Sequence, residues 1–421
     1  MKVVWIYVIA SLIPASLLAD TPLDWTSRAE QLVRTGDTQG AIAALSQAAT
    51  AEPASSESED KIGFLFAVLG RQNEAIDHFR KSISLDAHYS AAHYHLGVAL
   101  WIANDRDLAL PELQEAVRLS PAVSDYRFRL GSAYLDRGDF AQAAAELKEA
   151  VALDASKPAG WQSLGRALQN SGDLAGAVTA YQHVVALNPS DDNARNAYAG
   201  LLIETREPDH AIKESQQVLA HDPSNTTAQM NIGYAYLKKG EFDSAEKAYR
   251  DVLTNDPASV AAHFDLGIAL KMKDELELAQ KEFKEALRLD PSLAEARYTL
   301  GITNWQIGDF AGMIEQMREA IAIRPDYAEA HYMLGIGLKQ SGDLDAAIPE
   351  LKEAIRLDPS TPGPFNTLGQ ILRIKGDKQG SDEAFATGAR LKHDNEAQLA
   401  NTLEQGMRGG TFPKPLVAAP R

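Results

Sequence analysis

The stretch AEAHYMLGIGLKQSGDLDAAIPELKEAIRLDPST, residues 328–361, contains two helical patterns separated by a break. Apolar residues recur at a spacing of four from Ala330 to Leu338, which is typical of one face of a helix. Gly342-Asp343 is a helix-stop signal followed by a helix-start signal. The second pattern ends at Asp358-Pro359, because the residue before a proline is driven out of the α region. The stretch therefore predicts two helices joined by a tight turn.

The same pattern recurs every 34 residues along most of the chain. In this register eleven repeats fill residues 22–395, with Gly at the eighth position of nine repeats, Ala at the twentieth of nine and Pro at the thirty-second of eight. Glycine inside a helix costs about 1 kcal/mol relative to alanine. Its recurrence therefore predicts a close approach of the two helices, and we expect the twentieth-position alanine, such as Ala347, to face the glycine, such as Gly335.

This repeat resembles the tetratricopeptide repeat (TPR) family, whose 34-residue unit carries Trp-x2-Leu-Gly-x2-Tyr, Ala-x3-Phe and a late Pro. Residues 161–165 (WQSLG), with Ala177, Tyr181 and Pro189, form the copy that matches this pattern best. The resemblance implies an all-α fold, a right-handed α-solenoid (superhelix) of stacked helix-turn-helix hairpins. It also implies that the first helix of each repeat lines the concave face.

The segments outside the repeats carry their own signals. Residues 1–19 have a lysine at position 2 and then a long apolar run, as in a secretory signal peptide. The run is shorter than the ~20 residues of a membrane-spanning helix. We therefore favour cleavage after Ala19 over an uncleaved N-terminal anchor, and expect a periplasmic or secreted protein. Residues 396–407 predict a C-terminal capping helix, and residues 408–421, rich in Gly and Pro, predict a disordered tail.

Charge and cysteine content exclude several classes of partner. The formal net charge is −17 and no run of basic residues occurs, whereas phosphate binding relies on clustered Lys and Arg. We therefore expect no nucleic-acid partner, and a membrane contact only if the N-terminal segment stays uncleaved. The chain has no cysteine, so disulfides are excluded.

No pattern of catalytic chemistry appears in the sequence. There is no phosphate-binding loop, nucleophile elbow or paired-histidine metalloprotease motif. His93, His263 and His331 share the fourth repeat position, where the family often has Trp, so we expect them to pack between helices. We predict no enzymatic activity, no cofactor and no metal site.

The groove implied by the resemblance is the remaining candidate site. By the resemblance, positions 2, 5, 6, 9, 12 and 13 of the repeat would face it, and positions 5, 9 and 12 hold many large apolar side chains. The candidate peptide-binding residues are Tyr94, Trp101, Phe128, Met230, Tyr234, Phe264, Tyr298, Trp305 and Tyr332. Such a stripe suits an extended or helical peptide held by aromatic anchors. The same residues would also support packing between neighbouring first helices.

Three functions fit these features. The leading hypothesis is an exported, non-catalytic TPR scaffold or adaptor that binds a protein or peptide partner in its groove. An accessory carbohydrate-handling protein in polysaccharide assembly or export is the second, since aromatic faces stack on sugar rings. A structural spacer, gripped at its ends or on its convex side, is the third.

Overall fold

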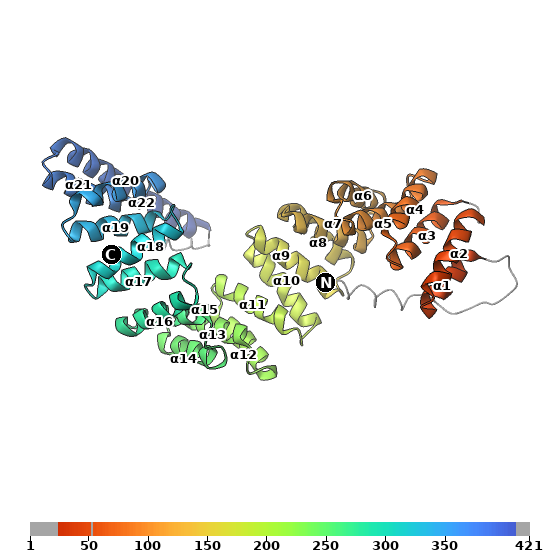
Figure 1. The fold of residues 1–421 in the computed structure, drawn as a ribbon, viewed down its shortest axis with the longest axis horizontal. Helices are drawn as coiled ribbons and strands as arrows, with labels where there is room; N and C mark the ends of the chain where they lie inside the picture. The colour runs from red at the N-terminus through yellow and green to blue at the C-terminus, as the bar shows by residue number, and fades with distance from the viewer. Residues whose placement is uncertain (1–23, 52–53, 410–421) are drawn as a thin grey trace. The chain divides into compact units, whose positions relative to one another are not determined.

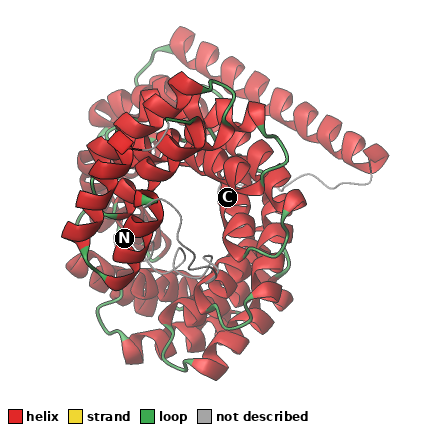
Figure 2. Cartoon of the chain, turned by 90° about the vertical axis from the view of Figure 1, so that its right-hand side faces the viewer, coloured by secondary structure: helices red, strands yellow, loops and turns green. Residues whose placement is uncertain are grey.

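The computed structural model describes residues 24–51 and 54–409, in which every regular element is an α-helix. Figure 2 shows these helices joined by short loops. None of the helices in these ranges combines the length and the apolar character needed to span a membrane. The predicted signal segment, residues 1–19, lies outside the described residues, as do residues 410–421 of the predicted tail.

The first of two compact units covers Met1–Glu207. Its helices are α1 (Trp25–Thr35), α2 (Thr38–Ala51), α3 (Ser56–Val68), α4 (Gln72–Leu85), α5 (Ser90–Ile102), α6 (Arg106–Leu119), α7 (Ser124–Arg137), α8 (Phe140–Leu153), α9 (Pro158–Asn170), α10 (Leu174–Leu187) and α11 (Asp192–Glu204). Each helix packs against the next one along the chain (Figure 1). The unit is thus a stack of five helical pairs in chain order, followed by α11.

The second unit covers Pro208–Arg421 and repeats this arrangement. Its helices are α12 (Pro208–His221), α13 (Thr226–Lys239), α14 (Phe242–Asn255), α15 (Val260–Met272), α16 (Leu276–Leu289), α17 (Ala294–Gln306), α18 (Phe310–Ile323), α19 (Ala328–Gln340), α20 (Leu344–Leu357), α21 (Pro362–Ile374) and α22 (Lys378–Gly409). Successive helices again pack together. Each layer buries its apolar face on its neighbours, as in an α-solenoid, which confirms the predicted fold class.

The turn between α19 and α20 has the predicted stop-and-start chemistry. Gly342 adopts a left-handed conformation, with φ of 84°. The Asp343 carboxylate then accepts a hydrogen bond from the Ala346 amide at 3.1 Å and caps α20. Asn104 and Asp274 occupy the same register as Gly342 and also have positive φ, at 68° and 63°. The backbone geometry of the turn is therefore kept even where its glycine is replaced.

The eighth-position glycines allow a close approach, and the nearest side chain belongs to a residue that the sequence analysis did not name. A Cβ atom on Gly335 would lie 2.7 Å from side-chain atoms of Leu351, a residue at the twenty-fourth position. Ala347, which we expected to face Gly335, presents only its carbonyl oxygen, at 3.6 Å. The alanine therefore does lie against the glycine, through its backbone, while the side chain that fills the contact comes from one turn further along α20.

The end of the second unit differs from the expected boundaries. Residues 396–407, predicted as a separate capping helix, form the C-terminal part of the 32-residue helix α22. The other repeats mostly end their second helix at a proline in the thirty-second position, where this repeat has His393. Helix α22 continues to Gly409, two residues into the predicted tail, whereas α4 and α8 end at Leu85 and Leu153 although their repeats also lack this proline.

Candidate functional site

All nine predicted groove residues lie on first helices of the repeats. Within the first unit they are on α5 and α7, and within the second on α13, α15, α17 and α19. Eight of them are half-buried, and Tyr234 is 37% exposed. Each side chain therefore keeps accessible surface while it also contacts its neighbours.

In the first unit these side chains join one repeat to the next. The Tyr94 ring on α5 stacks on Tyr126 of α7, with ring centroids 4.6 Å apart. Burial raises the pKa of the Tyr94 hydroxyl. The Arg106 guanidinium lies 5.2 Å from the Trp101 ring. Phe128 lines a small hollow of about 30 Å³ formed with residues of α8 and α9.

In the second unit the aromatic residues pack in the same manner. Phe264 lies 5.8 Å from Phe283 of α16, and Tyr298 lies 5.0 Å from Tyr327 at the start of α19. Burial raises the pKa of Tyr298 to about 12. Of the remaining candidates, all but Tyr234 pack on core residues. Met230, Trp305 and Tyr332 contact buried clusters, whereas Tyr234 is not among the residues packed on them.

These contacts give the stripe a structural role in stacking the repeats. Each of the nine residues also keeps accessible surface, so a binding role stays a prediction. Tyr234 is the candidate with the least structural role, since it is the most exposed of the nine. Its ring already has a cation beside it, with the Lys238 Nζ atom 4.8 Å from the ring centroid.

A charged residue that the sequence analysis did not single out lies among these side chains. Asp265 follows Phe264 on α15 and is half-buried. It forms no hydrogen bond or ion pair with the residues that the structure describes, and burial raises the pKa of its carboxyl group to about 6. The signal was present in residues 260–270 (VAAHFDLGIAL), where Asp265 is the one acidic residue in an apolar helix.

The fourth-position histidines do lie between helices, where they form polar clamps. His331 Nδ1 lies 2.6 Å from Glu350 Oε2 on α20, and its Nε2 lies 3.1 Å from the Pro325 carbonyl oxygen before α19. A neutral imidazole has a single N–H and can donate to only one of these acceptors. Arg127 occupies the same position and donates to both, at 2.7 Å to Pro121 O and 2.8 Å to Glu146 Oε2.

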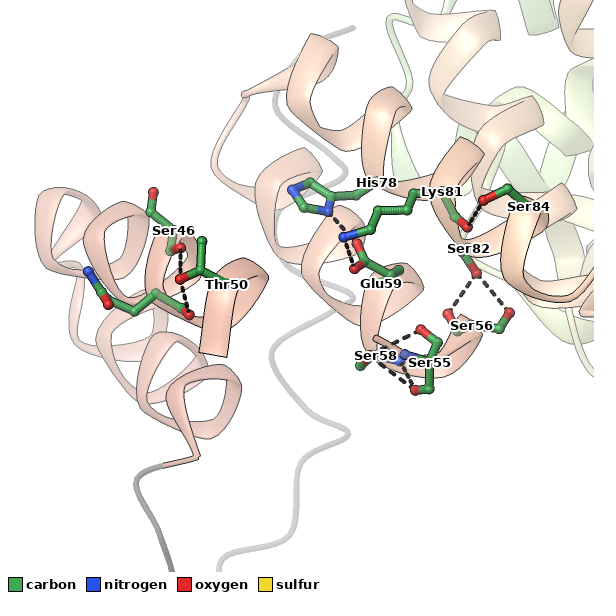
Figure 3. A network of polar contacts seen from close by, with 11 residues as sticks. Ser46, Thr50, Ser55, Ser56, Ser58, Glu59, His78, Lys81, Ser82 and Ser84 are labelled. Carbon is green, nitrogen blue, oxygen red and sulfur yellow. Dashed lines mark hydrogen bonds and ion pairs between the residues drawn. The ribbon is translucent and has the colours of Figure 1, made fainter. Parts of the chain in front are cut away.

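Acidic residues at the start of α3 are buried and paired. Glu59 is 2% exposed, and its carboxylate contacts both His78, at 2.7 Å, and Lys81 of α4 (Figure 3). Asp60 is 6% exposed and pairs with His95 at 2.8 Å. The histidines that cluster in this part of the sequence thus meet different carboxylates. In the described ranges, no three His, Asp or Glu side chains converge as metal ligands would.

The model for the cytochrome c-type biogenesis protein H TPR domain matches residues 110–261. One tetratricopeptide repeat model matches residues 65–122, 230–294 and 264–328, and a second matches residues 328–361. The search of curated protein sequences gives no match.

Several solved structures are similar to parts of this chain. MamA has 29% identity and a TM-score of 0.38, over 39% of this chain and 97% of MamA. YrrB, described as a TPR protein with an unusual peptide-binding site, has 18% identity and a TM-score of 0.39, over 44% and 96%. Yeast Tom70 has 14% identity and a TM-score of 0.47, over 91% and 96%.

The family matches follow one another along the stacked helical pairs of both units. Together they run without interruption from residue 65 to residue 361. The helices found there alternate at the spacing of the 34-residue repeat. This chain belongs to the tetratricopeptide repeat family.

Proposed function

We propose that this protein is an exported, non-catalytic adaptor that binds a partner protein along the first helices of its repeats. The TPR fold is a protein-interaction scaffold, which supports the broad class. The observation that carries the proposal is the recurrence of half-buried aromatic and apolar side chains on these helices, each with accessible surface left. In protein–protein interfaces, aromatic residues near the centre often contribute most of the binding energy. Export rests on the signal-like sequence of residues 1–19.

The test is capture of partners from the native host by wild type and by a variant of the stripe. The variant carries Tyr298→Ala, Trp305→Ala and Tyr332→Ala, all in the second unit. Since these residues also contact the buried cluster there, circular dichroism must show that the variant keeps its helices. Tyr234→Ala provides a milder second variant, because Tyr234 is the most exposed candidate.

The matched control removes exposed apolar side chains from second helices. Leu278 on α16 is 46% exposed and Ile323 on α18 is 39% exposed. A partner retained by wild type and by Leu278→Ala with Ile323→Ala, but lost by the stripe variants, would support the proposal. If wild type, the stripe variants and the control all retain the same partners, the nine groove residues serve only in packing. That result would favour the structural-spacer hypothesis.

A further inference from the structure

Asp265 is half-buried and, unlike the buried acidic residues Glu59 and Asp60, has no partner among the residues that the structure describes. The Glu59 carboxylate contacts Lys81 and His78, and the Asp60 carboxylate contacts His95. Asp265 has neither an ion pair nor a hydrogen bond with the described residues. Burying an unpaired carboxylate costs free energy, since water that solvates the charge is removed and nothing replaces it.

The surroundings of Asp265 are apolar and aromatic. One helical turn before and after it on α15 lie alanines and Ile268, because residues three and four apart share a face. The Tyr249 hydroxyl of α14 is fully buried without a hydrogen-bond partner. Burial, then the Asp265 carboxylate and Tyr234, raise the pKa of that hydroxyl. Tyr249 is therefore near Asp265 and Tyr234 of α13, but it does not satisfy the carboxylate.

A cation on the same helix does not satisfy it either. Lys271 lies six residues further along α15, about 9 Å at 1.5 Å per residue. It forms no ion pair with Asp265, and burial lowers the pKa of its ammonium group, with no carboxylate contributing. The acceptor oxygens of Asp265 are thus left for a donor from outside the described chain.

We propose that Asp265 anchors a lysine or arginine side chain of the partner protein, within a peptide segment that lies on α13 and α15. This rests on the proposed function and names the chemistry of the partner. A carboxylate receives a guanidinium or ammonium group through charge-assisted hydrogen bonds. The aromatic rings of Phe264 and Tyr234 suit the alkyl stem and charge of such a side chain. The Tyr234 ring already has one ammonium group beside it, from Lys238.

The test is selection of random peptides displayed on phage against the full chain. Wild type should enrich peptides with a lysine or arginine flanked by apolar residues. Peptides selected by Asp265→Asn should no longer be enriched in lysine or arginine. Peptides selected by Asp265→Lys should carry an acidic residue at that place. Asp251→Asn, which removes an exposed acid from α14, is the matched control and should select the same sequences as wild type.

A second arm leaves the protein unchanged and so does not depend on the folding of a variant. In a peptide selected by wild type, the basic residue is replaced by norleucine, which keeps the alkyl stem without the charge. We expect binding to wild type to weaken about tenfold or more. Binding to Asp265→Asn should weaken much less, since that protein has no charge to lose.

The outcomes separate this inference from the proposed function. Peptides that bind through apolar residues alone, without enrichment of lysine or arginine, would overturn the role of Asp265 and leave the adaptor function standing. Enrichment that is unchanged in Asp265→Asn would overturn it as well. Failure of every protein to select any peptide would count against both.

Discussion

Replacing Gly267 by alanine should destabilise the protein, although the same change stabilises most helices. Gly267 lies inside α15, against Phe283 of α16. A Cβ atom at this position would lie 2.5, 2.7 and 3.0 Å from three ring atoms of Phe283. The ring is 0% exposed and has no room to withdraw. Either the ring or the helix must therefore move.

The expected magnitude follows from two opposing contributions. Alanine gains about 1 kcal/mol over glycine in helix propensity. Overpacking of a filled core costs about 1–3 kcal/mol. The variant should therefore lose about 1 kcal/mol of unfolding free energy. In a Phe283→Ala background the ring is gone, so Gly267→Ala should instead gain about 1 kcal/mol, and the two sites should couple by about 2 kcal/mol.

The assay is a double-mutant cycle measured by urea denaturation of the full chain. Because repeat arrays need not unfold in one step, hydrogen exchange of the α15 and α16 amides should report the local change. Gly200→Ala is the control, since a Cβ on this helical glycine of α11 has nothing within 4 Å, and it should stabilise. Equal effects of Gly267→Ala in the two backgrounds would refute the close-approach argument.

Three further predictions concern the clamps, the turns and Asp265. His331→Arg should keep the stability of wild type while His331→Leu loses about 1–3 kcal/mol, because arginine reaches both Glu350 and the Pro325 carbonyl; exchange of the α19 and α20 amides tests this. Asp274→Gly should stabilise by about 1 kcal/mol in thermal unfolding, since it relieves a left-handed backbone. Asp265→Asn should stabilise at pH 7.5 by about 2 kcal/mol. Since burial raises the pKa of Asp265 to about 6, the wild-type penalty grows as pH rises through that value, and denaturation at pH 4 should show almost no difference.

The sequence predicted the helical pairs because their signals are local. The turn at Gly342-Asp343 depends on backbone sterics and on a cap within four residues, and both are found in the structure. The partner of Gly335 could not be predicted in this manner. The twenty-fourth position holds a leucine in this repeat and a phenylalanine at Phe283, so its size varies while its role does not. A periodic pattern reveals positions that keep the same residue, such as the glycine of this contact. It does not reveal the twenty-fourth position, whose residue changes from repeat to repeat.

For the candidate site, the repeat register placed the aromatic residues on the right helices. It did not identify Asp265, because the desolvation of a charge depends on what lies opposite it. The relevant neighbours, Tyr234 and Tyr249, come from α13 and α14. Likewise, His331 and Arg127 look unrelated in sequence, and their common role depends on a carbonyl six residues earlier and a carboxylate on the next helix.

The position of Asp265 within a well-packed region explains how an unpaired charge is tolerated there. In a stack of repeats, stability is a sum of local terms between neighbours, so a penalty at one repeat must be offset nearby. The side chains of Tyr249, Leu266, Leu270 and Phe283 form one buried cluster of α14, α15 and α16 and are all 0% exposed, and burying such side chains contributes about 1.5–3 kcal/mol each. Together they stabilise the folded state by more free energy than the desolvation of one carboxylate costs. A residue that lowers stability and is held by such packing is expected where function requires it, because an alanine at position 265 would fold at least as well.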